Sequence, residues 1–413
     1  MNLINIYWDP NAADKFIEKI ESELEKDNWL NLSISKPENK IIEEDLLPLG
    51  PGIILESGGS SGQINLCLHS FENLNMSAIA TAEWLDRNSI DPKLSIIFNP
   101  LPMNHISGLM PWWRSMLWGA KYIGVTPSEM KNPNGLEKNY KSILENEKNS
   151  NLISLVPTQL KRLMDHADGI KWLKAFDVIW IGGAGLSNQD AAKARKEGIR
   201  LSPCYGSSET AAMISALNPD AFLSGINNCG HALKDINLSL NNNGILKIKT
   251  PRLAIGLIRN GSINKLTKID GWWLSSDYAD LSNIDDGKYL KIFGRVDNAI
   301  NSGGEIVYPE ELEVRLIKET EKIGFDLKSV LFINVDSEEW GQRLSVLFRC
   351  RKKLSEEELK YAKYKLNNCI KGWKPSEKPI SWYECPELET NPKGKWERGK
   401  WLKWLDQYTK DNN

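Results

Sequence analysis

The chain has 413 residues, and its 52 Lys and Arg nearly balance its 54 Asp and Glu, which gives a formal net charge of -2 at pH 7. That balance provides no whole-chain field to draw nucleic acid or an anionic membrane, so any anion must bind at a local site. The length and the hydrophobic fraction of 41% exclude a disordered or fibrous chain and allow two or three domains.

The cysteines and the apolar runs of the sequence indicate the cellular compartment in which the protein is expected. The six cysteines have no C-x-x-C or zinc-ligand spacing, which favours isolated buried thiols in a reducing cytosol: Cys67, Cys204, Cys229, Cys350, Cys369 and Cys385. No apolar run approaches the ~20 residues of a membrane helix, and the N-terminus lacks a secretory pattern. We expect a soluble cytoplasmic protein without nucleic-acid partners; a homo-oligomer stays open.

Helical and strand signals alternate along the first half, which predicts an α/β fold. In chain order the signals are a helix at 11–26, a strand at 52–57, a helix at 74–87, a strand at 94–99, a strand and Pro-started helix across 151–164, and a strand with a small-residue turn at 176–187. The repeated plan is a buried strand, a Gly or Ser loop, then a helix. In open α/β sheets such loops are where ligands bind.

The composition shifts after about residue 235. Residues 236–250 and 287–300 each alternate like paired strands around an Asn or Gly turn, which predicts a more antiparallel region. The tail predicts a small α+β unit, with a helix at 309–320, strands at 329–335 and 343–350, and a helix at 355–370. The predicted boundary lies near Asp297, giving a large domain over 1–296 and a small mobile domain over 297–413.

The stretch "ESGGSSGQIN" from Glu56 to Asn65 follows an apolar run. Small residues let backbone N–H groups converge on an anion, and serine hydroxyls add donors. The stretch lacks both the G-x-x-x-x-G-K-[ST] pattern and the G-x-G-x-x-G spacing. Alone it is therefore more typical of a polar turn than of a phosphate site.

Four more segments follow in a fixed order: "PCYGSSET" (203–210), "GWWLSSDYAD" (271–280), "GRVDNAINSGGEIVYPEELE" (294–313) and "TNPKGKWER" (390–398). Together with "SGGSSG" they resemble the core motifs of the adenylate-forming superfamily, which includes acyl-CoA ligases, luciferases and peptide-synthetase adenylation domains. Within it, "LPMNHISGLMPWWRSMLWGA", "SLVPTQLKRLM", "IWIGGAGLS" and "SGGEIVYPEELE" look most like o-succinylbenzoate-CoA ligases of menaquinone or phylloquinone biosynthesis.

The resemblance implies a large N-terminal adenylation domain and a small C-terminal domain joined by a hinge. It implies that a carboxylate is activated with ATP and magnesium to an acyl-AMP, after which coenzyme A displaces AMP. Neither step needs a protein nucleophile, because in-line transfer at phosphorus needs positioning and charge stabilisation. This agrees with a sequence that has no obvious Ser/His/Asp or Cys/His set.

The resemblance also implies roles for single residues. The phosphate loop would be Ser57, Gly58, Gly59, Ser60, Ser61 and Gly62. The adenine pocket would comprise Tyr205 as the stacking ring, with Gly206 beside it, and a wall of Gly183, Ala184 and Gly185. Ser208 would reach the α-phosphate, Glu209 would bind magnesium, Asp277 would accept from the ribose hydroxyls, and Arg295 would be a nearby cation. Lys395 would bridge the attacking carboxylate and the α-phosphate.

Further residues concern the acyl group and the second half-reaction. Asp297 would be the hinge, and Gly303 and Gly304 would border the pantetheine channel. His105 and Arg114 would help form the acyl pocket, Arg114 holding the second carboxylate of o-succinylbenzoate, and Thr158 and Gln159 would line the same pocket. Taken singly, each residue also has an ordinary structural explanation, such as a turn aspartate at 277, a core histidine at 105 or a solvated basic run around 395.

The sequence departs from the family pattern in four places. Ile64 and Asn65 replace the usual Pro-Lys of the phosphate loop, and Ser275-Ser276 replaces Thr-Gly before the ribose aspartate. Asn298 replaces a second aspartate, and the region before the phosphate loop is shorter than usual. Two alternatives therefore stay open: a ligase for another aryl or short acyl acid, and a non-catalytic nucleotide-binding relative.

Overall fold

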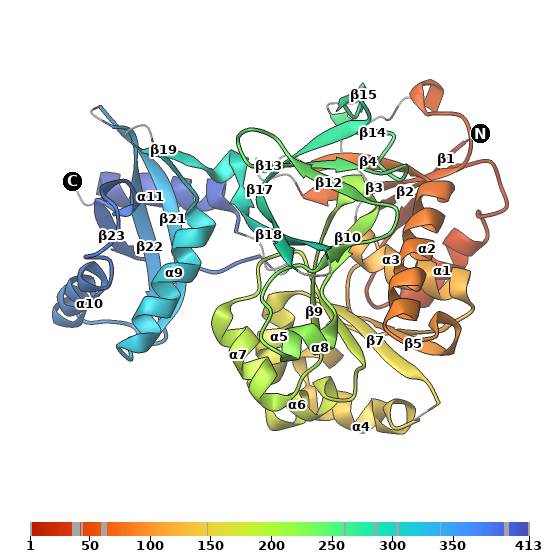
Figure 1. The fold of residues 1–413 in the computed structure, drawn as a ribbon, viewed down its shortest axis with the longest axis horizontal. Coiled ribbons are helices and arrows are strands. Elements are labelled where there is room, and N and C mark those ends of the chain that lie inside the picture. The colour runs from red at the N-terminus through yellow and green to blue at the C-terminus, as the bar shows by residue number, and fades with distance from the viewer. Residues whose placement is uncertain are drawn as a thin grey trace.

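The computed structural model describes residues 2–34, 42, 44–58, 64–146, 148–259, 262–284, 287–302, 305–338, 340–391 and 396–411. Its strands form three sheets of six, twelve and five strands. Figure 1 shows β19 to β23 with α9 to α11 grouped apart from the larger unit that contains the other two sheets.

The first sheet has the order β1-β2-β3-β4-β14-β15. Its elements are β1 (Leu3–Tyr7), β2 (Trp29–Ser33), β3 (Gly52–Gly58), β4 (Ile64–Ser70), β14 (Gly256–Arg259) and β15 (Ser262–Lys265), with α1 (Ala13–Glu21) between the first two strands. β1, β2 and β3 are parallel, whereas β3 and β4 are antiparallel with Gly58 opposite Ile64. The "SGGSSG" loop therefore joins two paired strands, and the expectation of a strand, loop and helix is wrong there.

The second sheet has the order β12-β13-β17-β18-β11-β10-β9-β8-β7-β5-β6, with β16 paired to β17. Its parallel half comprises β5 (Ser95–Asn99), β6 (Lys121–Gly124), β7 (Ser150–Leu155), β8 (Val178–Ile181) and β9 (Leu201–Ser207). Its antiparallel half comprises β10 (Ala212–Ala216), β11 (His231–Ala232), β12 (Asn237–Leu240), β13 (Ile245–Lys249), β16 (Lys268–Ile269), β17 (Trp272–Ile284) and β18 (Gly287–Arg295).

This arrangement confirms the predicted shift to antiparallel pairing, including the β12–β13 hairpin. The second predicted strand pair is wrong, because residues 287–295 form one strand whose partner is β17. β17 precedes β18 in the chain, so the alternation within 287–300 belonged to one strand and the connection after it.

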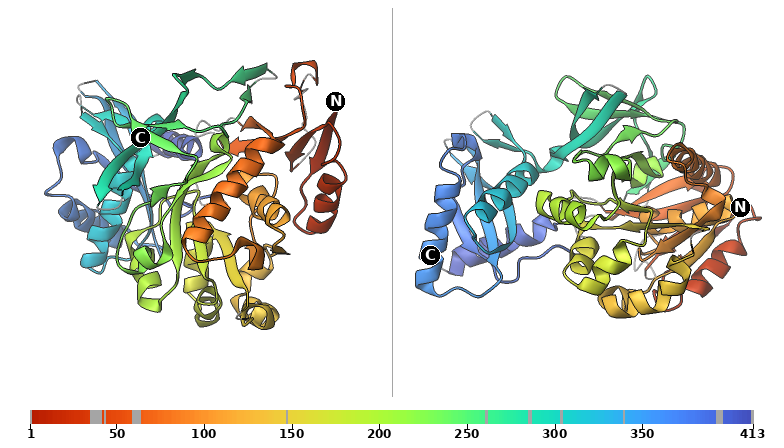
Figure 2. Two further views of the ribbon diagram at one scale, coloured as in Figure 1. Left: turned by 45° about the vertical axis from the view of Figure 1, so that its right-hand side comes forward. Right: turned by 60° about the horizontal axis from the view of Figure 1, so that its bottom comes forward.

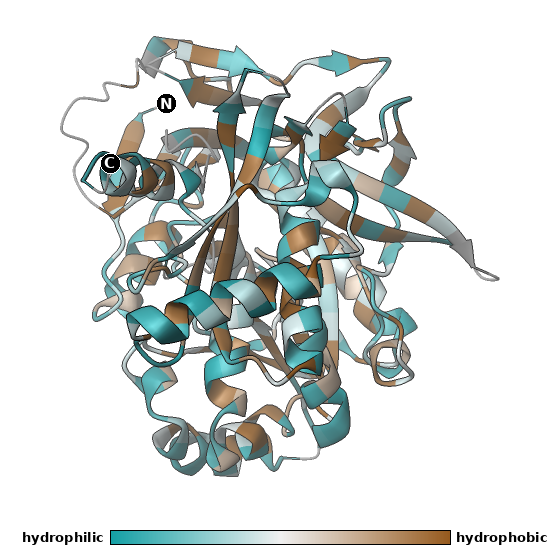
Figure 3. Ribbon diagram, turned by 90° about the vertical axis from the view of Figure 1, so that its left-hand side faces the viewer, coloured by the Kyte–Doolittle hydropathy of each residue, from teal (hydrophilic) through white to brown (hydrophobic). Residues whose placement is uncertain are grey.

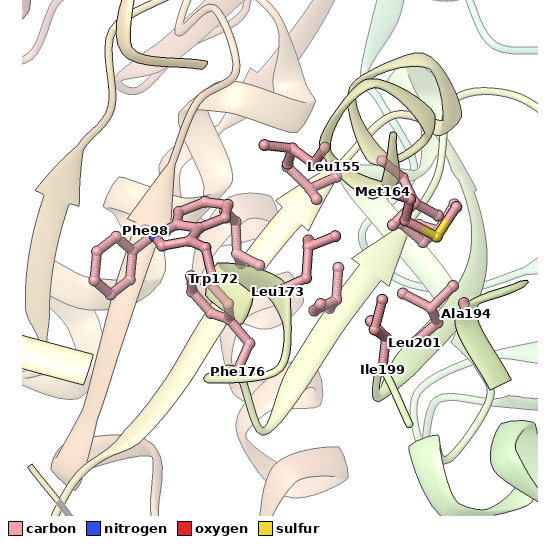
Figure 4. Close-up of a cluster of buried hydrophobic side chains, with 14 of the residues drawn as sticks. Phe98, Leu155, Met164, Trp172, Leu173, Phe176, Ala194, Ile199 and Leu201 are labelled. Atoms are coloured by element: carbon pink, nitrogen blue, oxygen red, sulfur yellow. The ribbon is translucent and has the colours of Figure 1, made fainter. Parts of the chain in front are cut away.

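Helices cover both faces of the parallel strands. α4 (Pro133–Leu144), α5 (Pro157–Met164), α6 (Ala167–Leu173) and α7 (Asn188–Glu197) lie on one face, with α8 (Pro219–Leu223) nearby. Figure 4 shows the core beneath them, where Phe98 packs edge-on against Trp172 and Phe176. Side chains alternate along a strand, so the apolar strands β5, β7, β8 and β9 also bury the opposite face of the sheet.

That second face packs on α2 (Phe71–Arg87), and α3 (Ile106–Trp118) lies against the first sheet. Figure 2 shows the two helices alongside the sheets of the large unit. Ser70 caps α2 by accepting from the Asn73 N–H at 3.2 Å. The two helices thus join both large sheets, and the N-terminus of α3 lies at the carboxyl end of β5.

The third sheet is built from β19 (Ile300–Ser302), β20 (Glu305–Val307), β21 (Leu327–Ser337), β22 (Gly341–Cys350) and β23 (Ser381–Glu384). α9 (Pro309–Lys322) and α10 (Glu356–Cys369) cover one face, and α11 (Arg398–Asp411) covers the other. Figure 3, viewed from this side, shows hydrophilic stretches on the helices and hydrophobic stretches on strands behind them. The chain passes from the second sheet to the third between Arg295 and Ile300, through a 3-10 turn.

Within the described residues, no helix is long and apolar enough to cross a membrane. All six cysteines are unpaired, and Cys67, Cys350 and Cys385 are buried. Burial raises the pKa of the Cys67 thiol well above its ordinary value and that of Cys204 to about 12, so both stay protonated at neutral pH.

Candidate active site

Four neighbouring parallel strands end at one edge of the second sheet. β5, β7, β8 and β9 pair in that spatial order, so the segments that follow their carboxyl ends gather together. These segments carry residues singled out from the sequence: His105 and Arg114 after β5, Thr158 and Gln159 after β7, Gly183 to Gly185 after β8, and Glu209 after β9. The sheet therefore brings together positions more than one hundred residues apart in sequence.

The loop after β8 has a backbone that requires glycine. Gly183 has a φ of +82°, and a Cβ there would lie 3.5 Å from Val156, which begins the turn into α5. Gly183, Ala184 and Gly185 are all exposed. An exposed backbone without bulky side chains is a surface that a flat ring can approach closely.

The "YGSSE" segment runs from β9 into a single 3-10 turn over Ser208–Thr210. A Cβ on Gly206 would lie 2.1 Å from the Ala212 carbonyl oxygen of the antiparallel neighbour β10, so only glycine fits at this crossing. The Ala254 N–H donates to the Glu209 carbonyl oxygen at 2.7 Å. The Glu209 carboxylate itself forms no hydrogen bond or ion pair with the residues that the structure describes.

Tyr205 and Asp277 are joined directly, since the tyrosine hydroxyl donates to Asp277 Oδ2. Asp277 lies opposite Arg295 in the β17–β18 ladder, and its own N–H donates to Ser275 Oγ at 3.1 Å. Burial raises the pKa of Asp277, and the Tyr205 hydrogen bond and the Arg295 charge oppose that rise. The negative charge of Glu209 also raises the pKa of Tyr205, Asp277 and Arg295.

His105 is held by the backbone carbonyl of Glu56, a residue that sequence reasoning did not assign, and its Nε2 lies 3.3 Å from Asn104 Nδ2. Its Nδ1 lies 3.1 Å from the Glu56 carbonyl oxygen and its Nε2 lies 3.9 Å from Glu56 Oε2, which also accepts from Asn104 Nδ2 at 3.2 Å. Glu56 ends the apolar run of β3 and begins the glycine-rich stretch. The position of Glu56, an acidic residue at the end of a buried strand, was the sequence signal that could have identified it as a site residue.

Arg114 lies on α3 with only 4% of its surface exposed. Its guanidinium lies 5.5 Å from the ring centroid of Trp180 on β8, and its Nε has no hydrogen-bond partner. Among the described residues no carboxylate pairs with it, and the charge that acts most on its guanidinium is that of another cation, Arg252. Burial, followed by that like charge, lowers the pKa of Arg114 to about 10, so it stays charged at neutral pH.

Thr158 and Gln159 occupy the first turn of α5, and both are half-buried. Gln159 Oε1 accepts from the Val156 N–H at 3.1 Å and thus caps the helix. This contact gives Gln159 a local structural role. Its place in the acyl pocket stays a prediction, as does that of Thr158.

Several predicted site residues lie outside the described part of the chain. These are Gly59, Ser60, Ser61 and Gly62 of the phosphate loop, Gly303 and Gly304, and Lys395. Of the phosphate loop, Ser57 is described and buried at the end of β3, and Gly58 ends that strand. Asp297 is exposed in the connecting turn, where its Oδ2 accepts from Arg295 Nη2 at 2.7 Å.

The described residues could bind magnesium only together with the phosphates of a bound substrate. They contain no group of three or more His, Cys, Asp or Glu that could hold a metal. Glu209 offers hard carboxylate oxygens that no described side chain uses. Mg²⁺ keeps several waters and is commonly bound through one or two carboxylates plus substrate phosphates, which a single free carboxylate suits.

Comparison with known proteins also points to the o-succinylbenzoate-CoA ligases that the sequence motifs resemble. No family model matches the chain. The chain is 28% identical over 288 residues to the 2-succinylbenzoate-CoA ligase of Listeria monocytogenes serotype 4b (strain F2365), covering 70% of this chain and 57% of that relative. The chain therefore matches less than two thirds of this curated relative's length.

Two solved structures share the fold. The o-succinylbenzoate CoA synthetase (MenE) of Bacillus subtilis in complex with its acyl-adenylate intermediate OSB-AMP aligns with a TM-score of 0.72 at 16% identity, over 97% of this chain and 87% of that one. The same enzyme in complex with ATP and magnesium ion aligns with a TM-score of 0.71 at 17% identity, over 97% and 88% of the two chains. The chain resembles the 2-succinylbenzoate-CoA ligases of the adenylate-forming family. Its fold is that of the adenylate-forming enzymes, a large α/β unit of layered sheets with a small α+β unit after it.

Proposed function

We propose that this adenylate-forming family member is an ATP-dependent acid–CoA ligase that acts on 2-succinylbenzoate. In its first step the succinyl carboxylate attacks the α-phosphorus of ATP, giving an acyl-AMP and pyrophosphate. In the second step the thiol of coenzyme A attacks the acyl carbon, giving 2-succinylbenzoyl-CoA and AMP. The similarity to curated 2-succinylbenzoate-CoA ligases supports the reaction class.

The buried Arg114 is the observation that supports 2-succinylbenzoate as the substrate. A buried charge without a counter-ion is costly, and proteins retain one where a ligand supplies the opposite charge. 2-Succinylbenzoate has a second carboxylate, on its ring, that is not activated. That carboxylate would pair with Arg114 by charge-assisted hydrogen bonds, while the Trp180 ring beside the guanidinium offers an apolar surface to the substrate.

The nucleotide would bind across the adjoining strand ends. Asp277, oriented by Tyr205 and Ser275, would accept from the ribose hydroxyls, and the exposed Gly183 loop would flank adenine. Ser208 would donate to the α-phosphate. Glu209 would hold magnesium, which supplies positive charge to the departing pyrophosphate when bound.

The small unit would supply Lys395 for the first step and the Gly303–Gly304 segment for the second. We propose that the domain boundary lies at Asp297, in the turn where the chain leaves the second sheet. Rotation about that turn would exchange the two segments at the site. The role of His105 would be to line the acyl pocket, oriented by Glu56.

The experiment is an acid panel. The purified protein is incubated with ATP, magnesium, coenzyme A and either 2-succinylbenzoate, benzoate or anthranilate, and AMP release is measured. AMP release with 2-succinylbenzoate above the other acids is expected. Release with benzoate-type acids but not 2-succinylbenzoate would identify a different aryl-acid ligase, and no release with any acid would favour a non-catalytic nucleotide-binding protein.

A further inference from the structure

The backbone that follows Glu209 has a conformation that alanine disfavours. Ala211 has a φ of 50° and Ala212 a φ of 76°, so two consecutive residues with a Cβ lie in the left-handed region. Such backbone persists only where the surroundings hold it, and here it immediately follows the turn that carries Glu209. The contacts that hold it therefore decide where the Glu209 carboxylate points.

Arg252 makes those contacts through its planar guanidinium. Its Nη1 donates to Ser77 Oγ at 2.6 Å, and Ser77 Oγ in turn donates to the Ala211 carbonyl oxygen at 2.5 Å. Its Nη2 donates to the Met213 carbonyl oxygen at 2.9 Å. One side chain thus fixes a carbonyl on each side of the Ala212 peptide, one directly and one through a hydroxyl from α2.

Arg252 is itself fixed on its remaining edge. It is fully buried, and its Nε lies 2.8 Å from Asp235 Oδ2, which also accepts from Thr250 Oγ1 at 3.2 Å. The guanidinium therefore has a carboxylate on one side and the Glu209-bearing segment on the other. Its planar fork directs donors along fixed lines, which a lysine ammonium does not do.

We propose that Arg252 is a positioning residue for the metal-binding carboxylate. By holding Ala211 and Met213, directly and through Ser77, it keeps the left-handed backbone in place and aims Glu209 at the ion shared with the ATP phosphates. This inference rests on the proposed function, in which Glu209 is the magnesium ligand. Arg252 touches neither nucleotide nor acid in this scheme, and its effect on binding passes entirely through the Glu209 segment.

The test compares two ligands by calorimetry. ATP with Mg²⁺ uses the ion that Glu209 holds, whereas AMP without metal uses the ribose and adenine contacts alone. In Arg252→Met, if the productive backbone falls to about one tenth of the population, the Kd for ATP with Mg²⁺ rises about tenfold, while the Kd for AMP changes by less than about threefold. Arg252→Lys should recover little of the loss, because it cannot reach both acceptors.

A second variant protects the test against misfolding. Ser77→Ala removes only the link to the Ala211 carbonyl and should also raise the Kd for ATP with Mg²⁺ selectively. Adding Ala211→Gly to Ser77→Ala should restore part of the affinity, since glycine adopts a positive φ without steric cost. Arg195→Met is the matched control, because Arg195 also donates to two carbonyl oxygens, of Phe222 and Ile226, but outside the site.

The results separate the two proposals. If Ser77→Ala and Arg252→Met lower the thermal midpoint but leave the ratio of the two Kd values at its wild-type level, Arg252 has only a structural role and this inference is overturned. If the unaltered protein binds AMP but gains nothing for ATP from Mg²⁺, the proposed function fails instead. A selective loss in both variants, absent from Arg195→Met, supports the positioning role.

Discussion

Replacing Arg114 by methionine should stabilise the free protein while weakening acid binding. The fall in its pKa to about 10 corresponds to about 3 kcal/mol that burial and the nearby Arg252 cost the charged form. Methionine keeps much of the volume and removes that cost, at the loss of the contact with Trp180. We expect Arg114→Met to leave the free energy of unfolding unchanged or to raise it by up to about 3 kcal/mol.

The loss should appear in the Michaelis constant of the acid. A hydrogen bond to a charged group contributes about 1.5–3 kcal/mol, so the KM for 2-succinylbenzoate should rise about 10- to 150-fold, with the KM for ATP little changed. The matched substrate is 4-oxo-4-phenylbutanoate, which keeps the activated chain and ring but lacks the ring carboxylate. Its KM should be similar in the wild-type protein and in Arg114→Met.

The assays are AMP release for KM and denaturant unfolding for stability, both at pH 7.5. A protein that is destabilised by more than about 1 kcal/mol, with equal KM changes for the two acids, would show that Arg114 packs the core and does not bind substrate. An equal rise in the KM of ATP and of 2-succinylbenzoate would refute the assignment of Arg114 to the acyl pocket.

Three further results are expected. Asp297→Pro should slow thioester formation while sparing pyrophosphate release, measured as separate single-turnover steps; equal losses in both would contradict the hinge. Gly206→Ala should destabilise the protein by about 1–3 kcal/mol in denaturant unfolding, because its Cβ would meet the Ala212 carbonyl oxygen at 2.1 Å. Tyr205→Phe removes the hydrogen bond that opposes the raised pKa of Asp277, so the acid limb of AMP affinity should move to higher pH; an unmoved limb would show that Asp277 does not accept from ribose.

Much of the fold follows from local pattern, because buried strands and amphipathic helices leave periodic signals. The Pro-started helix α5 and the hairpin of β12 and β13 were predicted closely. The glycine-rich stretch was misplaced because pairing of β3 with β4 depends on partners distant in sequence, which a loop composition does not encode. For the same reason β18 was divided wrongly, since its true partner β17 precedes it.

The candidate site likewise contains residues that the sequence could indicate and residues that only the folded chain reveals. Glu209 and Asp277 were predicted as site residues because the motifs that contain them resemble those of a family. Ser77 and Arg252 were not, because their contacts span 134 and 175 residues of sequence and arise only when α2 packs beside β10. A buried serine within a helix and an arginine after a strand each have an ordinary local explanation, so no local signal identified the pair.

The departure at Asn298 also has a structural explanation in the contacts around Glu310. Asn298 Nδ2 donates to Glu310 Oε1 at 2.6 Å, and Arg398 Nη2 lies 3.2 Å from the same oxygen. An aspartate at 298 would place a second carboxylate against Glu310, whereas the amide donates to it. The residue after the proposed hinge and the residue that begins α11 therefore share one acceptor.

Arg398 extends this connection into the core of the small unit. It is 14% exposed, donates to the Phe332 carbonyl oxygen at 2.5 Å and pairs with Glu313 at 2.9 Å. Arg398, which follows the segment that carries Lys395 outside the described residues, is thus tied to strand β21. A large displacement of the lysine by loop movement alone would be opposed by this anchor. The contacts therefore favour rotation of the whole small unit about Asp297 as the way in which Lys395 would leave the site after adenylation.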